Sequence, residues 1–136
     1  MRKLVFLIVI SVFISACSND IDSTPDFYLE VLPVKEVVLP TKFSKGQSYE
    51  IEVTYIAPNS CYTFNGFSLQ GNNQERTVGI VNSVDLTDDC NNVPEEVRIS
   101  FDFTVDGTES IVFKFYKGLG NTGNNEFYTV EVPIIE

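Results

Sequence analysis

The sequence of 136 residues contains no histidine and no tryptophan, and it contains three cysteines. Without histidine, the chain has no imidazole for general acid–base catalysis or for binding a metal ion. Without tryptophan, it lacks the side chain most used for stacking on sugars. Basic residues are also few, with 9 Lys+Arg against 19 Asp+Glu and a net charge of −10. This acidic balance excludes nucleic acid as an expected partner, because nucleic-acid binding needs patches of Lys and Arg.

Long hydrophobic runs are scarce, and the one clear example lies at the N-terminus, from Leu4 to Ile14. It is shorter than the roughly 20 residues that a helix needs to cross a bilayer. The basic residues Arg2 and Lys3 precede it, and small residues follow it. This order is typical of a secretory signal peptide. A buried core helix is the alternative, and it is disfavoured because no other part of the chain has a helical pattern to pack against it.

The residues Ile14-Ser15-Ala16-Cys17 resemble the lipobox of bacterial lipoproteins, although Ile14 replaces the usual leucine. The resemblance implies that residues 1–16 are removed as a lipoprotein signal peptide and that Cys17 receives a diacylglycerol. It implies an anchor in the outer membrane, with the domain on the periplasmic or the surface-exposed face. Removal of the two basic residues of the signal peptide changes the net charge from −10 to −12.

Residues 17–26 are small, polar and acidic, and they are expected to form a flexible tether after the lipid. Asp20 and Asp22 resemble the acidic export signal of lipoproteins of the Bacteroidota type. The segment Asp22-Ser23-Thr24 resembles the short O-glycosylation motif of the same group. A solvated linker with neither property remains the alternative.

Assigning Cys17 to lipid leaves Cys61 and Cys90, which are expected to form a disulfide in an oxidising exported environment. Such a bond would close a loop of about 30 residues and stabilise the domain by roughly 3–4 kcal/mol. Two free thiols or a pair of metal ligands are the alternatives. Two thiolates make a poor zinc site without further Cys or His ligands.

From residue 27 onward, apolar residues alternate with polar ones, which is typical of strands with one buried face. The clearest strand is residues 97–105, where every odd position is apolar and every even position polar. Further strands are expected at 49–55, 111–116 and 127–132, and weaker ones at 27–32, 34–39, 62–69 and 76–84. Asp106-Gly107 lies between two of the best strands and predicts a short hairpin there.

Residues 27–136 are therefore expected to form an all-β domain, an immunoglobulin-like antiparallel β-sandwich of about 7–8 strands. Residues 45–53 resemble the start of the second strand of bacterial immunoglobulin-like domains, and this resemblance implies the same architecture. A closed lipocalin-type barrel is the alternative, and it suits a domain of this length less well.

Two groups of residues are candidate sites. Asp85, Asp88, Asp89 and Asn91 offer oxygen ligands for calcium, although their spacing differs from the EF-hand loop and a solvated loop is the alternative. Tyr62, Phe64 and Phe67 form an aromatic cluster beside Cys61 that could bind a partner or a glycan. Core packing is the alternative for these rings, with a bulge near Gly66 that would return Phe67 to the same face.

No enzyme activity is expected, because Ser and Cys nucleophiles lack a histidine base and no carboxylate pair is visibly arranged across a cleft. Apart from the candidate calcium loop, we expect no catalytic residue, no metal ligand and no cofactor. The hypothesis is a membrane-anchored envelope lipoprotein that acts as a non-enzymatic interaction or structural module for an envelope protein or a glycan. The alternative is a lipoprotein that binds a small ligand or glycan, assisted by calcium.

Overall fold

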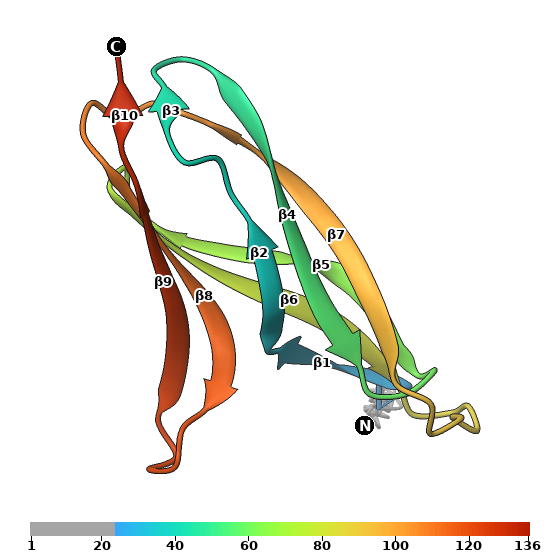
Figure 1. The fold of residues 1–136 in the computed structure, drawn as a ribbon. Helices are drawn as coiled ribbons and strands as arrows, with labels where there is room; N and C mark the ends of the chain where they lie inside the picture. Colours follow the sequence, from blue (N-terminus) through green and yellow to red (C-terminus); the bar gives the residue numbers. More distant parts are fainter. Residues whose placement is uncertain (1–23) are drawn as a thin grey trace, which may run out of the picture.

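The structure, a computed structural model, describes residues 24–136. The predicted signal peptide, the predicted lipid site at Cys17 and all but the last three residues of the predicted tether lie outside these residues. The described part is an all-β domain of packed sheets without a helix (Figure 1). Its strands are β1 (Phe27–Leu32), β2 (Val34–Val38), β3 (Phe43–Ser44), β4 (Ser48–Ala57), β5 (Tyr62–Gly71), β6 (Glu75–Asp85), β7 (Glu95–Thr104), β8 (Ile111–Leu119), β9 (Asn125–Val132) and β10 (Ile134–Ile135).

The eight longer strands overlap the eight ranges predicted from alternation of apolar and polar residues, with ends that differ by up to three residues. The two strands of two residues each, β3 and β10, were not predicted, because such a short segment cannot display an alternating pattern. The prediction of an all-β domain is therefore confirmed.

The strands form a five-stranded sheet, a three-stranded sheet in the order β2-β4-β7, and the small pair β10-β3. In the five-stranded sheet, β6 pairs with β5 along one edge and shares its other edge between β8 and β1. The β6–β8 and β3–β10 pairings are parallel, so the prediction that all strands pair antiparallel is wrong for these two, whereas the other pairings are antiparallel. No sheet of the described domain closes on itself.

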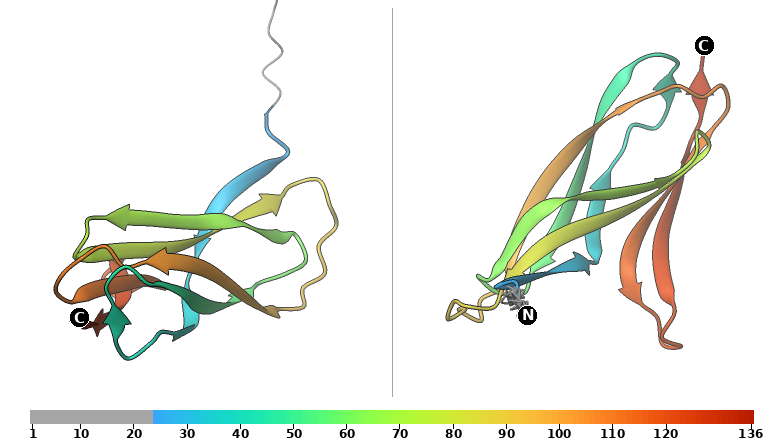
Figure 2. Two further views of the ribbon diagram at one scale, coloured as in Figure 1. Left: turned by 90° about the horizontal axis from the view of Figure 1, so that it is seen from above. Right: turned by 180° about the vertical axis from the view of Figure 1, so that it is seen from behind.

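The core lies between the five-stranded and the three-stranded sheets, which form two layers when viewed from above (Figure 2, left). Each layer contributes every second side chain of its central strands, since successive side chains of a strand point to opposite faces. The three-stranded sheet supplies Ile51, Val53 and Tyr55 from β4, and the facing sheet supplies Phe113 and Phe115 from β8. Removal of this apolar surface from water is the main force that holds the layers together.

The predicted hairpin at Asp106-Gly107 is wrong. Strand β7 belongs to the three-stranded sheet and β8 to the five-stranded sheet, so the segment between them crosses from one layer to the other. The amide of Val105 donates to the carbonyl oxygen of Gln47 at 2.9 Å, which keeps the chain beside β4 up to this point. Because each strand has one apolar face, this crossing lets the rings of Phe103 and Phe113 meet across the core at 5.2 Å.

Candidate functional site

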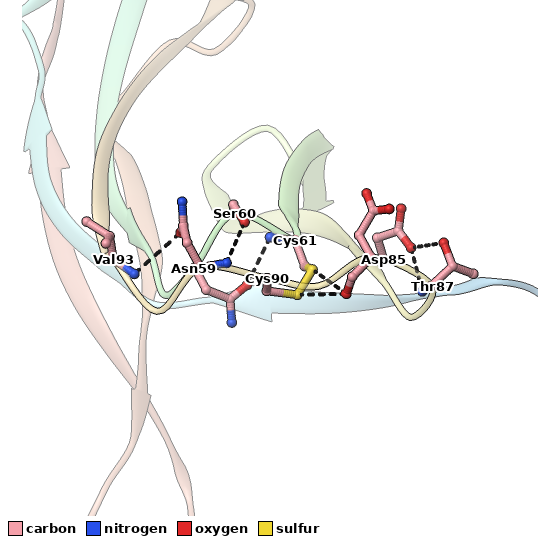
Figure 3. Close-up of a disulfide and its surroundings, with 9 residues drawn as sticks. Asn59, Ser60, Cys61, Asp85, Thr87, Cys90 and Val93 are labelled. Carbon is pink, nitrogen blue, oxygen red and sulfur yellow. Dashed lines mark hydrogen bonds between the residues drawn. A yellow bond between two sulfur atoms is a disulfide. The ribbon is translucent and has the colours of Figure 1, made fainter.

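The predicted disulfide between Cys61 and Cys90 is present, with their Cα atoms 5.4 Å apart (Figure 3). It joins the β4–β5 loop to the β6–β7 loop, and both of these loops cross between the two sheets at the same end of the domain. Ser60 adds two hydrogen bonds between the loops. Its amide donates to the carbonyl oxygen of Asn91 at 3.4 Å, and its Oγ accepts from the amide of Asn91 at 3.0 Å. The disulfide therefore fixes one end of the layered core.

The acidic loop follows β6 beside this disulfide. Oδ1 of Asp85 accepts hydrogen bonds of 2.7 Å from both the amide and the hydroxyl of Thr87 (Figure 3). These bonds, led by the one from the amide, lower the pKa of the Asp85 carboxyl below its ordinary value. Oδ1 of Asn91 accepts from the amide of Val93 at 3.4 Å. Two of the four predicted calcium ligands thus take part in turns of the loop itself.

The other two predicted calcium ligands, Asp88 and Asp89, have exposed side chains. The carbonyl oxygen of Asp88 lies 3.7 Å from the sulfur of Cys61 and 3.5 Å from that of Cys90; these are close contacts and not hydrogen bonds, because the disulfide sulfurs carry no hydrogen. In residues 24–136, no group of three or more Cys, Asp or Glu side chains is arranged to hold a metal ion. Calcium binding by this loop stays a prediction.

The aromatic cluster lies along β5, at the side of the sandwich bordered by the edge strands β5 and β7. The pairing of β5 with β6 shifts register between Phe64 and Gly66, as expected for the predicted bulge. The ring of Phe67 lies 5.2 Å from that of Phe64 and 4.9 Å from that of Phe101 on β7. All three predicted rings are partly buried and pack against the core. The rings close the gap between the edge strands β5 and β7. Binding of a partner or a glycan by these rings stays a prediction.

Tyr62 has a second role at this site. Its hydroxyl donates a hydrogen bond of 2.7 Å to Oε2 of Glu30, which joins β5 to β1 across the face of β6. This bond is the main cause of a raised pKa for Tyr62, because the carboxylate stabilises the protonated phenol. The phenol is therefore a structural hydrogen-bond donor.

The opposite side of the sandwich, between β2 and β9, is not closed in this way. The three-stranded sheet ends at β2, which packs over β8, so that β9 extends beyond it (Figure 1). As a result, the side chain of Tyr128 on β9 is 52 % exposed. The neighbouring inner position, Val130, is only partly buried.

A groove follows this open side. One hollow of about 450 Å³ and a second of about 370 Å³ share Val37 and Tyr128 in their walls, so they form one continuous depression. We name this depression the β2–β9 groove and define it by Val34, Val37, Leu39, Lys117, Tyr128 and Val130.

Tyr128 and Val130 share one face of β9, which agrees with the alternation that predicts a strand at 127–132. The sequence missed the groove itself, because alternation shows which face of a strand is apolar and not where the facing sheet ends.

No helix in residues 24–136 is long and apolar enough to cross a membrane. Comparison with protein-family models, with curated proteins and with solved structures found no match for this chain.

Proposed function

We propose that this chain is an outer-membrane lipoprotein of the bacterial envelope, anchored by lipid on Cys17, whose domain is a non-enzymatic interaction module. The order of a basic start, a short apolar run and Ile14-Ser15-Ala16-Cys17 supports the anchor. The disulfide of the described domain suits an exported protein. The absence of histidine from all 136 residues supports a role without acid–base chemistry.

The proposed architecture is immunoglobulin-like, with eight strands of five or more residues in two principal layers. The likeness concerns the layers and not the order of strands. In an immunoglobulin domain the principal strands pair antiparallel, whereas β8 pairs parallel with β6 in this domain.

The β2–β9 groove is the single observation that carries the interaction role. Tyr128 is a large aromatic side chain half exposed beside an unpaired strand edge, and the hollows on both sides of it are lined by Val34, Val37 and Val130. Aromatic and aliphatic side chains in a hollow are the usual anchors of a protein interface. An unpaired strand edge offers backbone groups to an extended segment of a partner.

The two edges that border the groove differ in how well they resist pairing. Strand β2 has five residues, lies between Pro33 and Pro40, and shifts register after Val34. Short length, proline and bulges are all features that protect an edge. Strand β9 has eight residues, contains no proline or lysine, and pairs only with β8 within the described domain. We therefore assign the edge of β9 as the one that receives the extended segment.

Site-specific photo-cross-linking tests this assignment in the full, membrane-anchored chain. The photoreactive amino acid benzoylphenylalanine replaces Tyr128 on β9 or, as a matched control, Leu69 on β5. Both side chains are 52 % exposed and lie on edge strands of the same sheet. We expect an adduct of one defined mass from position 128, its loss when Val130→Lys is added, and no such adduct from position 69. The same adducts from both positions, or none from position 128, would overturn the proposal.

A further inference from the structure

The outer face of the five-stranded sheet contains a second hollow, at the point where β1 and β8 share one edge of β6. Strand β8 pairs with β6 up to Val78, and β1 pairs with it from Ile80 onward, which leaves Gly79 between them. The rear view shows β1 and β8 leaving β6 in different directions (Figure 2, right). The space has a volume of about 340 Å³.

Gly79 forms the floor of this hollow. A Cβ atom added at this position would lie 3.2 Å from Cγ1 of Val31 and 3.6 Å from Cβ of Ser68. The first distance is tighter than ordinary van der Waals contact, so any larger side chain at position 79 would fill the floor and push against β1. The lack of a side chain at Gly79 is therefore what keeps the hollow open.

One wall of the hollow is a pair of aromatic rings. Tyr116 on β8 and Phe127 on β9 are directly opposite each other in the antiparallel pairing. Their ring centroids are 6.2 Å apart and their planes are inclined at 66°. Both side chains are partly buried, although they project from the outer face of the sheet. Aromatic rings on this face do not contribute to the core between the sheets, so core packing does not explain them.

The remaining lining is uncharged and combines the apolar Val31 and Val78 with four polar side chains. Ser68, Gln70, Thr77 and Asn125 line the hollow together with Val31, and no charged side chain does. Four other hollows of the described domain each include a charged residue in their lining: Lys35, Asp106, Arg76 and Glu131. In a chain with a net charge of −10, an uncharged lining is a distinct chemical property.

The two lysines of β8, the strand that carries Tyr116, are paired with carboxylates. Lys114, the cross-strand partner of Thr77, lies 3.0 Å from Oε1 of Glu75. Lys117 lies 3.8 Å from Oε2 of Glu126. Each of these exposed pairs is worth little in stability. Each lysine of β8 is therefore balanced by a carboxylate, so this strand adds no net charge beside Tyr116.

The four polar side chains are free to bind a ligand. Within the described domain, no side-chain hydrogen bond engages Ser68, Gln70, Thr77 or Asn125. Amide and hydroxyl side chains both donate and accept hydrogen bonds. Sugar hydroxyl groups have the same dual capacity, so these side chains match a ligand that is rich in hydroxyls and carries no charge.

We propose that this outer-face hollow is a binding site for a neutral saccharide. The apolar C–H face of a sugar ring lies against Tyr116 and Phe127, and its hydroxyls bond to the amides of Gln70 and Asn125. The volume is at the lower end of the range of about 300–1,000 Å³ for small-ligand sites, which suits a short oligosaccharide. An apolar ligand would leave the four polar groups without partners, and a charged ligand would find no counter-ion.

Binding of defined oligosaccharides to the full chain tests the proposal. The probes are an immobilised panel of neutral hexose, pentose and N-acetylhexosamine oligomers and a matched panel of uronate and sulfated oligomers. The dissociation constant for the best neutral probe is then measured by calorimetry. Phe127→Ala removes one ring, and Gly79→Val fills the floor. Leu119→Ala is the control, because Leu119 is 67 % exposed at the end of β8 and does not line the hollow.

We expect a neutral oligomer to bind, with Phe127→Ala and Gly79→Val each weakening it by about tenfold or more, which corresponds to roughly 1.4 kcal/mol. Leu119→Ala should leave the dissociation constant unchanged. Circular dichroism shows whether Gly79→Val folds, and Phe127→Ala decides the result if it does not. Failure of every neutral oligomer to bind, preference for the charged panel, or binding that ignores Phe127→Ala would overturn the proposal. None of these outcomes depends on cross-linking at Tyr128, which lies on the other face of β9.

Discussion

The hydroxyl of Tyr55 on β4 donates a hydrogen bond of 2.8 Å to Oδ1 of Asn82 on β6. Both side chains are buried, with 1 % and 0 % of their surface exposed, and they come from opposite sheets of the sandwich. The bond is a polar connection between the layers in a core that is otherwise mostly apolar. Within the described domain, Nδ2 of Asn82 has no hydrogen-bond partner. Buried polar groups are costly unless they are paired, so each atom of this connection has a measurable energetic role.

The variant Tyr55→Phe should lower the free energy of unfolding by about 1–3 kcal/mol, because it leaves Oδ1 of the buried Asn82 without a partner. The measurement is urea denaturation followed by circular dichroism. A surface variant such as Tyr128→Phe serves as the control for loss of a phenolic hydroxyl. An unchanged urea midpoint for Tyr55→Phe would show that the buried hydrogen bond does not stabilise the fold.

The double variant Tyr55→Phe, Asn82→Leu should recover most of the stability that Tyr55→Phe loses. It removes both partners together, and it also removes the unpaired Nδ2 donor. A double-mutant cycle gives the coupling energy between the two side chains. If the change in the free energy of unfolding of the double variant equals the sum of the changes in the two single variants, the side chains are not coupled and this description of the core is wrong.

Loss of the disulfide should destabilise the domain. The chain-entropy model gives about 3–4 kcal/mol for closing a loop of this length. The variant Cys61→Ser, Cys90→Ser is compared with the unmodified chain in urea, and the unmodified chain with reductant is the control. The two disulfide-free forms should have similar midpoints, both below that of the oxidised chain. Equal midpoints for all three would contradict the stabilising role.

Stability should fall as the pH rises above about 10. The hydrogen bond to Glu30 raises the pKa of Tyr62 above its ordinary value of 10.0, and burial raises the pKa of Tyr55. Above pH 10 the unfolded chain therefore loses phenolic protons that the folded chain retains, which favours unfolding. Tyr62→Phe should make this decline shallower, and it is measured as the urea midpoint at several values between pH 9 and 11. The same slope with and without Tyr62 would refute the prediction.

Lipidation should depend on Cys17 alone among the three cysteines. Cells that express the full chain are grown with an alkyne fatty acid, and the label is detected on the protein by click chemistry. The unmodified chain and the Cys61→Ser variant should carry the label, whereas Cys17→Ala should not. Label on Cys17→Ala, or none on the unmodified chain, would rule out the proposed anchor.

The strands could be predicted from the sequence because the alternation of apolar and polar residues along each core strand shows which of its faces is buried. In β7, the odd positions 97–103 point inward and the even positions are exposed, as the alternation requires. The inward positions 97, 99 and 101 are partly buried, and only Phe103 and Val105 are buried. This increase in burial along the chain depends on how the two sheets meet and not on the residue types in β7. The same limit explains the wrong hairpin at Asp106-Gly107, since a turn sequence does not determine which sheet the next strand joins.

The disulfide was predictable for a different reason, because counting cysteines left one natural pair once Cys17 was assigned to lipid. The β2–β9 groove and the outer-face hollow could not be located from the sequence. Each depends on where a neighbouring element ends: the three-stranded sheet at β2, and the pairing of β8 with β6 at Val78. A sequence signal did exist for the outer-face hollow, since Tyr116 and Phe127 are aromatic residues at positions that alternation assigns to the wet face.

Amide hydrogen exchange of β9 tests the central claim, that this domain binds an envelope partner through the β2–β9 groove, most directly. The full chain is measured alone and in complex with the protein that cross-links from position 128. We predict slower exchange in the complex for those amides of Asn125–Val132 that point away from β8, because an added strand bonds to the unpaired edge. Exchange in β5, an edge strand of the same sheet, should not change. Unchanged exchange in β9, or equal slowing in β5, would contradict the claim.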